Sequence, residues 1–532
     1  MTTASTSLSE RATLWRELAQ GEKTWDLVIV GGGIIGAGVL REAARRGLSA
    51  LLVEQRDFAW GTSSRSSKMV HGGLRYIASG DIRLTRDAVR ERERLLHEAP
   101  GLIERMGYYF TLRRGQFPGR YVFSLLLAFY DWLAGIRNHR YVSRDEMRQN
   151  YDGIDQRGLK GAVYYTDTVT DDARLVLRVL QEAVEAGGRA LNYAKADSLI
   201  REDGRVCGVV LHNAQGGERA EVRARAVISA TGAWADRLRN EVNPEKRIRP
   251  LRGSHLVLPF ARLPVPDALT LLHPADRRPV FVFPWEGTTV VGTTDLDHGG
   301  GLDEEPAISD EEVDYLLTVL QQQFPDHAIG RGDIVSTWSG VRPVIGSEKS
   351  RDPSKERRDH AVWNDQGLVT VSGGKLTTFR LIALDAINAA CGEPAAKVAD
   401  ERVFSAVTLA PAELDTTDES WARRLLGRYG DRARELFDIA GPGETRPIAG
   451  TLFCLAECRW AARHEAVVHL DDLLLRRTRL GCIVARGAED LLPELETICR
   501  EELGWDSERW RSEVARYLAL WRRHYYLPSQ DA

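Results

Sequence analysis

The chain of 532 residues is too long for one ordinary domain, and we expect two or three. Its 43% hydrophobic and 28% charged residues are typical of a folded, soluble protein, and its net charge of −4 argues against nucleic acid as the main partner. We see no signal peptide and expect the six cysteines to be reduced thiols in a cytoplasmic compartment. Cys454 and Cys458 lack a matching second pair, so no metal site is expected.

A glycine-rich turn near the N-terminus predicts a dinucleotide site. The apolar run Asp26–Val30 is typical of a buried parallel strand, and it leads into Gly31-Gly-Gly33-Ile-Ile-Gly36, which fits G-x-G-x-x-G. Gly31 permits the tight turn, Gly33 lets backbone N–H groups approach a pyrophosphate, and Gly36 lets the following helix pack closely. A second apolar strand ends at Glu54, at about the ~20-residue spacing expected of an acid that holds a ribose hydroxyl. The alternative is an ordinary β-α-β turn with a surface glutamate.

The next segments combine polar and apolar patterns. The run from Gly61 to Tyr76, GTSSRSSKMVHGGLRY, is rich in hydroxyls and glycines that suit a polar cofactor chain. Residues 81–97 predict a charged amphipathic helix. The aromatic stretch Tyr121–Ile136 is interrupted by Asp131 and is shorter than the ~18 apolar residues of a membrane span. It predicts either a buried helix or a helix in a membrane interface.

Later segments predict a return to the first sheet, a second sheet and a helical end. A strand that ends in Ala230-Thr-Gly-Ala-Trp-Ala-Asp236 indicates that the chain comes back beside the glycine turn. Residues 251–295 predict antiparallel strands that would cover an active site. Ser372-Gly-Gly-Lys-Leu-Thr-Thr-Phe-Arg380 joins a strand to a helix and predicts a second helix N-terminus directed at an anion. After a linker at 410–418, aromatic residues at helical spacing predict a small helical domain.

Together these motifs resemble the FAD-dependent, quinone-linked glycerol-3-phosphate dehydrogenases within the D-amino-acid-oxidase-like flavoproteins. The resemblance covers nearly the whole chain. Its most specific motifs are the run that ends in HGGLRY, RGSH at Arg252 and SGGKLTT at Ser372, with further support from YTDTVTDDARLVL, VVGTTD and SGVRP. The sequence departs from many relatives at Arg65, where a small residue is usual, and at Arg252, where others carry lysine.

The resemblance implies an α/β fold with three parts. A Rossmann-like FAD-binding domain would be built from the discontinuous segments 24–110, 160–250 and 335–392. The insert 111–159 and residues 251–334 would form an antiparallel β substrate-capping domain, and 405–528 a C-terminal α-helical domain. FAD would be bound by residues from both glycine turns and the segments beside them: Gly31, Gly33, Gly36, Glu54, Thr62, Ser63, Ser64, His71, Gly72, Thr231, Gly232, Gly374, Leu376 and Thr377.

The resemblance also implies the reaction, in which hydride leaves C2 of sn-glycerol 3-phosphate for flavin N5 and gives dihydroxyacetone phosphate. The substrate-site residues carried over are Arg75, Tyr76, His255, Arg342, Arg358 and Lys375. His255 would be the base, Arg342 would help to hold the phosphate dianion, and Lys375 would stabilise negative charge. Each has a structural alternative: His255 as an ordinary strand histidine, Arg342 as a salt-bridge partner, and Lys375 as a sheet cap.

Electrons from the reduced cofactor would pass to ubiquinone or another membrane quinone. The protein would then bind peripherally to the cytoplasmic face of the inner membrane, with the stretch Tyr121–Ile136 as the candidate contact. The alternatives are a glycerol-3-phosphate oxidase that uses oxygen, another flavin oxidase of amino or hydroxy acids, and a flavin-binding sensor without catalysis. A homodimer is possible, and the C-terminal domain would serve either dimerisation or support of the fold.

Overall fold

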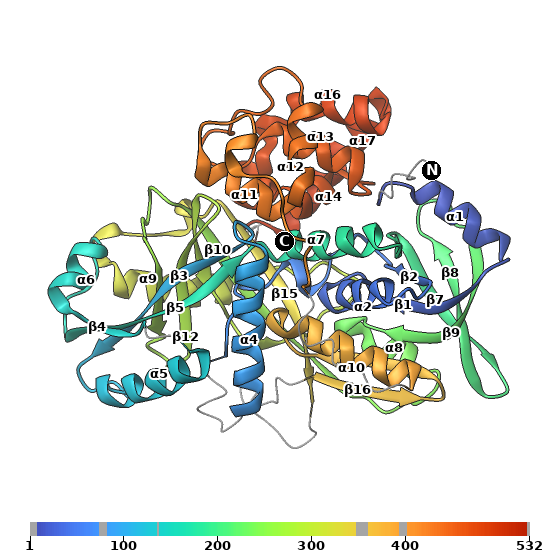
Figure 1. Ribbon diagram of the computed structural model, residues 1–532. Coiled ribbons are helices and arrows are strands. Elements are labelled where there is room, and N and C mark those ends of the chain that lie inside the picture. The colour runs from blue at the N-terminus through green and yellow to red at the C-terminus, as the bar shows by residue number, and fades with distance from the viewer. Residues whose placement is uncertain (1–7, 74–81, 136–137, 347–359, 393–401, 529–532) are drawn as a thin grey trace.

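The computed structural model describes residues 8–73, 82–135, 138–346, 360–392 and 402–528. Figure 1 shows a sheet with helices on the right, a second sheet on the left, and helices of the C-terminal part above both. Within the described residues, no helix is long and apolar enough to span a bilayer.

The first sheet has a parallel centre in the order β17-β9-β1-β2-β6, with β16 antiparallel at one edge. An antiparallel ribbon, β7 and β8, extends β9. The strand expected to lead into Ala230-Thr-Gly is β9, which ends one residue before Ala230. The strand bounds are β1 Thr24–Val30, β2 Ala50–Val53, β6 Arg189–Leu191, β7 Ala194–Glu202, β8 Arg205–Asn213, β9 Arg219–Ser229, β16 His360–Asp365 and β17 Leu368–Gly373.

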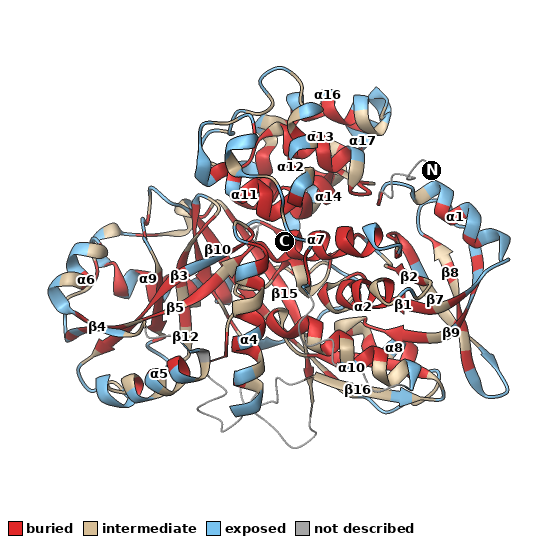
Figure 2. Cartoon of the chain, viewed as in Figure 1, coloured by how far each residue is buried: buried red, intermediate tan, exposed pale blue. Residues whose placement is uncertain are grey.

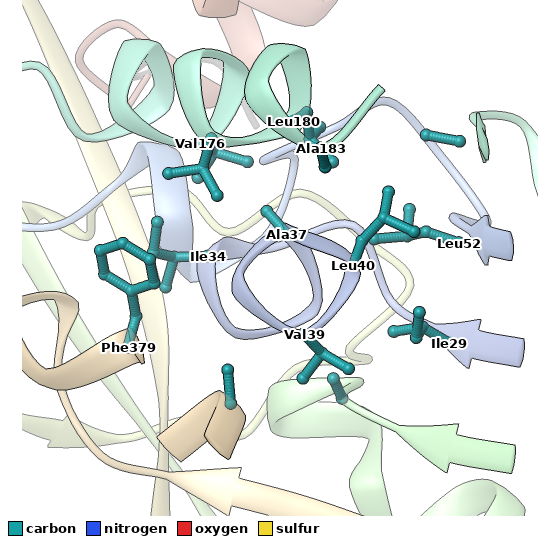
Figure 3. Close-up of a cluster of buried hydrophobic side chains, with 14 of the residues drawn as sticks. Ile29, Ile34, Ala37, Val39, Leu40, Leu52, Val176, Leu180, Ala183 and Phe379 are labelled. Atoms are coloured by element: carbon teal, nitrogen blue, oxygen red, sulfur yellow. The ribbon is translucent and has the colours of Figure 1, made fainter. Parts of the chain in front are cut away.

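Three helices pack on this sheet because their apolar faces match: α2 (Ile34–Arg45), α7 (Asp172–Glu185) and α10 (Phe379–Cys391). Figure 3 shows Ala37 of α2 directed at α7, with Leu40 directed at Leu52 of the sheet. Small residues allow this close approach, since a Cβ on Gly38 would lie 2.8 Å from the ring of Phe379. The glycine turn therefore sits at the end of a rigid, fully buried layer.

The second sheet is antiparallel except where β3 runs parallel to β11. Its order is β14-β10-β13-β12-β11-β3-β5-β4, and β15 pairs with the other edge of β10. Helices α6 (Arg144–Asn150), α9 (Asp310–Gln323) and α5 (Arg120–Ala134) lie around it. The strand bounds are β3 Ile103–Arg113, β4 Arg140–Ser143, β5 Leu159–Thr170, β10 Ile248–Pro259, β11 Ala268–Leu272, β12 Pro279–Trp285, β13 Thr288–Gly292, β14 Leu296–Asp297 and β15 Ser336–Ile345.

Strands β3, β5 and β15 belong to this second sheet, although most of their residues fall within the ranges expected for the FAD-binding domain. The chain passes between the two sheets repeatedly. The domain division given from the sequence therefore stays a prediction, while the α/β class with a helical C-terminal part is confirmed.

The C-terminal helices form a unit around buried Trp460, Tyr517 and Trp521. Buried ion pairs tie it to the rest of the chain: Asp57 contacts Arg476 and Arg477. The longer helices here are α11 Glu419–Tyr429, α12 Ala433–Asp438, α13 Leu455–His464, α16 Leu492–Leu503 and α17 Ser507–His524, with short α14 Leu470–Asp472 and α15 Leu480–Ile483 between them. Outside this unit are α1 Arg11–Gln20, α4 Ile82–Glu98 and α8 Ala235–Arg239.

Helix α5 has one buried face and one exposed face, and contact of the exposed face with a membrane stays a prediction. Phe123 and Leu127 are buried against the second sheet, as is Tyr130. The opposite face is open to solvent: Tyr121 is 83% exposed and Leu125 74%. Figure 2 shows the helix pale blue and tan along much of its length. The helix is thus amphipathic, with aromatic side chains on both faces.

Candidate active site

The glycine turn between β1 and α2 is closed by backbone contacts that exclude side chains. Gly31 has φ +115°, and a Cβ there would lie 2.5 Å from the carbonyl oxygen of Ala230 at the end of β9. A Cβ on Gly36 would lie 1.9 Å from the carbonyl oxygen of Gly31. Gly33, the N-cap residue of α2, has no side chain of its own to cap the helix. The turn therefore presents backbone N–H groups and a helix N-terminus to an anion.

Glu54 lies beside this turn at the end of β2. Its Oε2 accepts a hydrogen bond of 2.6 Å from the N–H of Gly32, and Oε1 accepts one of 2.9 Å from Arg56. Burial raises the pKa of Glu54, and the two N–H donors oppose that rise. The carboxylate is thus fixed next to the turn, where a ribose hydroxyl of a dinucleotide is expected.

The hydroxyl-rich segment passes from the first sheet to the second. Ser63 Oγ accepts a 3.0 Å hydrogen bond from the N–H of Ile34, the first residue of α2. Thr62 Oγ1 donates to the carbonyl oxygen of Val341 on β15 at 2.5 Å. Farther along, the carbonyl oxygen of His71 accepts a 3.0 Å bond from Thr377 Oγ1. The glycine turn, β15 and the Ser372–Arg380 segment therefore meet around this one segment.

The second glycine-containing turn, at Gly373 and Gly374, lies on the other side of the site. Ser372 Oγ at the end of β17 donates to the carbonyl oxygen of Gly232 at 3.0 Å. Gly374 has φ +78°, and Lys375 follows it just before the short helix Leu376–Thr378. The Lys375 ammonium nitrogen is inaccessible to solvent. The segments around Gly232 and Gly374 therefore lie together, as the sequence predicts.

His255 lies on β10 and is 1% exposed. Its ring stacks on Trp338 of β15 with centroids 5.0 Å apart, and its Nε2 lies 2.9 Å from Ser67 Oγ. Burial, followed by the positive charges of Arg342 and Lys68, holds the pKa of His255 well below its usual value. The ring is therefore neutral at physiological pH and is able to accept a proton.

Arg342 on β15 faces the same side of the sheet as His255. The register pairs Arg342 with Leu251 and Trp338 with His255, so Gly253 stands between the two side chains on β10. Arg342 Nη1 donates to Asp295 Oδ1 at 3.1 Å, and Nη2 donates to Thr293 Oγ1 at 3.0 Å. The guanidinium is thus held in one orientation, in contact with a carboxylate, as the salt-bridge alternative requires.

Three residues of the expected substrate site, Arg75, Tyr76 and Arg358, lie outside the described residues. The sequence interpretation also missed residues that contact the site. Ser67, Lys68 and Trp338 surround His255, and all three occur inside or beside the quoted motifs. Their proximity to His255 in space had no signal in the sequence, because it depends on pairing between distant segments.

Comparison with known proteins gives the family. A family model described as FAD dependent oxidoreductase matches residues 26–383. The chain belongs to this family. A second family model, described as the C-terminal domain of alpha-glycerophosphate oxidase, matches residues 393–510 of this FAD-dependent oxidoreductase.

The named relatives of this chain show to which group within the family it belongs. The chain is 34% identical to glycerol-3-phosphate dehydrogenase 2 of Mycobacterium tuberculosis, across 96% of this chain and 90% of that protein. It is 34% identical to the aerobic glycerol-3-phosphate dehydrogenase of Bacillus subtilis, across 86% and 87%. It is thus an FAD-dependent member of the glycerol-3-phosphate dehydrogenase family, and the resemblance seen in the sequence is confirmed.

Solved structures agree with this placement. The glycerol-3-phosphate dehydrogenase from Bacillus halodurans, complexed with FAD, is 27% identical, and the match covers 97% of this chain and 98% of that chain with a TM-score of 0.76. The L-alpha-glycerophosphate oxidase from Mycoplasma pneumoniae shares the fold at 16% identity, over 73% of this chain, with a TM-score of 0.57. FAD as the cofactor is thereby confirmed. The tight glycine turn and the fixed carboxylate of Glu54 fit that group.

Proposed function

We propose that this chain oxidises sn-glycerol 3-phosphate to dihydroxyacetone phosphate and passes the electrons to a membrane quinone. The relatives named glycerol-3-phosphate dehydrogenase support the substrate. The observation that carries the proposal is a neutral, buried imidazole and a fixed guanidinium on one face of a sheet, at His255 and Arg342. A phosphate and a carbinol of one small molecule require such a pair, because one group binds charge while the other removes a proton.

FAD would be bound by the glycine turn and the neighbouring segments described above. The glycine turn and the start of α2 would bind its pyrophosphate, and Glu54 would bind its ribose. The residues proposed for this role are Gly31, Gly33, Gly36, Glu54, Thr62, Ser63, Ser64, His71, Gly72, Thr231, Gly232, Gly374, Leu376 and Thr377. When bound, FAD supplies the acceptor for the hydride that leaves C2.

The substrate phosphate would be bound by arginines. Arg342 is oriented by Asp295 and Thr293, so its guanidinium loses little freedom when an anion binds. Arg75, Tyr76 and Arg358 remain predicted partners of the same substrate. A dianionic ester held in this way keeps its C2 carbon in a fixed place, which lowers the entropic part of the barrier.

His255 would take the proton of the C2 hydroxyl, since its ring is neutral and buried. Lys375 would stabilise negative charge on the substrate oxygen as that proton leaves. The burial of His255 and Trp338 keeps bulk water from the imidazole. These roles assign one task to each of the three proposed catalytic residues, His255, Arg342 and Lys375.

Transfer of electrons to a membrane quinone requires contact with the bilayer, and α5 offers a surface for it. Tyr121, Leu125 and Trp132 are 83%, 74% and 72% exposed. Arg114 and Arg120 lie just before them and are exposed as well. Aromatic and apolar side chains beside arginines are typical of a helix that lies in the interface of an anionic membrane. We propose that this face of α5 binds the cytoplasmic face of the inner membrane. The proposal includes no nucleic-acid partner, and it allows a homodimer.

The competing function is oxidation of the same substrate with oxygen as acceptor, which the description of the second family model favours. The test uses purified protein reduced anaerobically by glycerol 3-phosphate and then mixed with either oxygen or a short-chain ubiquinone. Bleaching of the flavin by this substrate, followed by faster reoxidation with quinone, is the expected result. Faster reoxidation by oxygen with release of peroxide favours the oxidase, and no bleaching refutes both functions.

A further inference from the structure

The segment that carries Ser67 is held in an unusual backbone conformation. Lys68 has φ +59°, a left-handed value that a residue with a side chain adopts only when other contacts hold it. Those contacts converge on Asp172 at the start of α7. Its Oδ2 accepts from the N–H and the hydroxyl of Ser66, at 2.9 and 2.7 Å, and its Oδ1 accepts from Lys68 Nζ at 2.8 Å.

Ser67 stands between these two fixed residues and contacts His255. The indole N–H of Trp338 donates to the carbonyl oxygen of Ser66 at 3.3 Å. The imidazole is thus bounded by the Ser67 hydroxyl at Nε2 and by the face of Trp338, and both depend on the same backbone segment. Within the described part of the chain, His255 Nδ1 has no hydrogen-bond partner.

Arg479 is one of the residues that connect the C-terminal helical unit to this segment. Arg479 lies before α15, and its side chain is fully buried. Arg479 Nη2 donates to Asp172 Oδ1, and Nε donates to Asp171 Oδ1 at 3.0 Å. Arg479 therefore fixes the carboxylate that in turn fixes Ser66 and Lys68.

We propose that Ser67 is a positioning residue for His255 and that Arg479 sets its place from the C-terminal unit. The Ser67 hydroxyl accepts the Nε2–H of the ring, which leaves the lone pair on Nδ1, the atom that takes the substrate proton. The inference rests on the proposed role of His255 as the base. It gives the C-terminal unit a part in catalysis besides dimerisation or support.

The first test compares Ser67→Ala with Ser67→Thr in the FAD-loaded enzyme. We expect kcat to fall about tenfold in the alanine variant, with KM for glycerol 3-phosphate nearly unchanged, because a well-placed base contributes about 10²–10⁴-fold. Threonine keeps the hydroxyl and restores the rate. The control is Thr289→Val, which removes a buried hydroxyl bonded to the carbonyl oxygen of Leu263 at 2.6 Å on the other face of the sheet. An equal loss in alanine and threonine variants overturns the inference.

The second test measures the tautomer of the His255 ring in protein that is not catalysing the reaction. Nitrogen-15 NMR of histidine-labelled protein, with His255→Asn to assign the signal, reports which nitrogen carries the proton. We expect an Nε2–H tautomer in the wild type and a mixture in Ser67→Ala. As a single substitution, Arg479→Lys should lower kcat. When it is added to Ser67→Ala, it should lower kcat no further. An unchanged tautomer in Ser67→Ala overturns the inference, whereas turnover that survives His255→Asn refutes the proposed base.

Discussion

The guanidinium of Arg342 occupies the space above Gly253, where a Cβ would lie 2.5 Å from Nη2 and 2.6 Å from Thr293 Oγ1. Any side chain at this position must displace Arg342 from Asp295 and Thr293. We expect Gly253→Ala to lower kcat/KM for glycerol 3-phosphate about tenfold or more, since a displacement of ~1 Å can cost up to 10²-fold. Steady-state kinetics with purified protein measures this effect.

A matched control for that variant is Gly299→Ala, because a Cβ on Gly299 meets no atom within 4 Å. It should leave kcat/KM at the wild-type value. Equal kinetics for both alanine variants would mean that the position of Arg342 does not matter for the substrate. Retention of FAD, seen in the visible spectrum, shows that the fold of each variant is intact.

The pH dependence of the reaction follows from the environment of His255. Burial and the charges of Arg342 and Lys68 lower its pKa, so the ring stays neutral where an exposed histidine, with a pKa near ~6.5, becomes protonated. The rise of kcat/KM with pH that reports this base should therefore lie below pH ~6.5. A pH–rate profile checks this prediction, and a rise centred at or above 6.5 contradicts it. Lys68→Met removes one of the two charges and should move the rise upward.

His255→Asn should reduce kcat by about 10²–10⁴-fold if the ring is the base, while flavin binding is unaffected. The asparagine keeps a polar side chain near Ser67 but cannot accept a proton from a hydroxyl. The measurement is stopped-flow reduction of the bound flavin by glycerol 3-phosphate. A reduction rate close to that of the wild type would assign the proton transfer to another group.

The sequence predicted the parts of the fold that depend on local patterns. The β1–α2 turn and Glu54 follow from residue spacing alone, because the three glycines and the acid have fixed positions along one β-α-β unit. The contact of Ser67 with His255 was not predicted, since the two are 188 residues apart and no local pattern connects them. Arg479 and Asp172 are 307 residues apart, and no local pattern connects them.

Helix α5 shows a different limit of prediction from the sequence. Its composition predicted a buried or an interfacial helix, and the structure has one buried face and one exposed face. Aromatic residues on all sides of the helix obscured its 3.6-residue period, because Phe123 and Tyr130 pack inward while Tyr121 and Trp132 point outward. Only the packing against the second sheet shows which aromatic side chains are free to meet a partner.

A double variant, Leu125→Glu with Trp132→Glu, tests the outer face of α5. Both side chains are exposed, so the fold should tolerate the change, while two carboxylates oppose insertion into an anionic interface. We expect loss of sedimentation with anionic liposomes and unchanged activity with a soluble dye acceptor. Leu452→Glu, at an exposed leucine in the C-terminal unit, is the control. Undiminished liposome binding of the double variant would remove α5 as the contact.

The buried ion pairs of Asp57 predict how strongly the C-terminal unit is coupled to the FAD-binding layer. Burial raises the pKa of Asp57, but the guanidinium groups of Arg477 and Arg476 outweigh it and hold that pKa below its usual value. The pair therefore stabilises the folded state above pH ~4 and loses this contribution as pH falls through the lowered pKa. Asp57→Asn removes the carboxylate that Arg476 and Arg477 share, although Arg476 keeps Asp471 and Asp472, and it should lower the free energy of unfolding by about 3–5 kcal/mol.

Urea unfolding of the FAD-loaded protein at pH 7 measures that loss, and Glu496→Gln supplies the control. Glu496 pairs with Arg500 on the exposed side of α16, and its removal should cost at most about 1 kcal/mol because solvent screens the pair. The difference between the two variants should shrink as the pH falls below ~4, because the unfolded wild-type chain then binds a proton at Asp57 that the folded state does not. An Asp57→Asn protein as stable as Glu496→Gln at pH 7 would mean that the C-terminal unit is held by its apolar contacts instead.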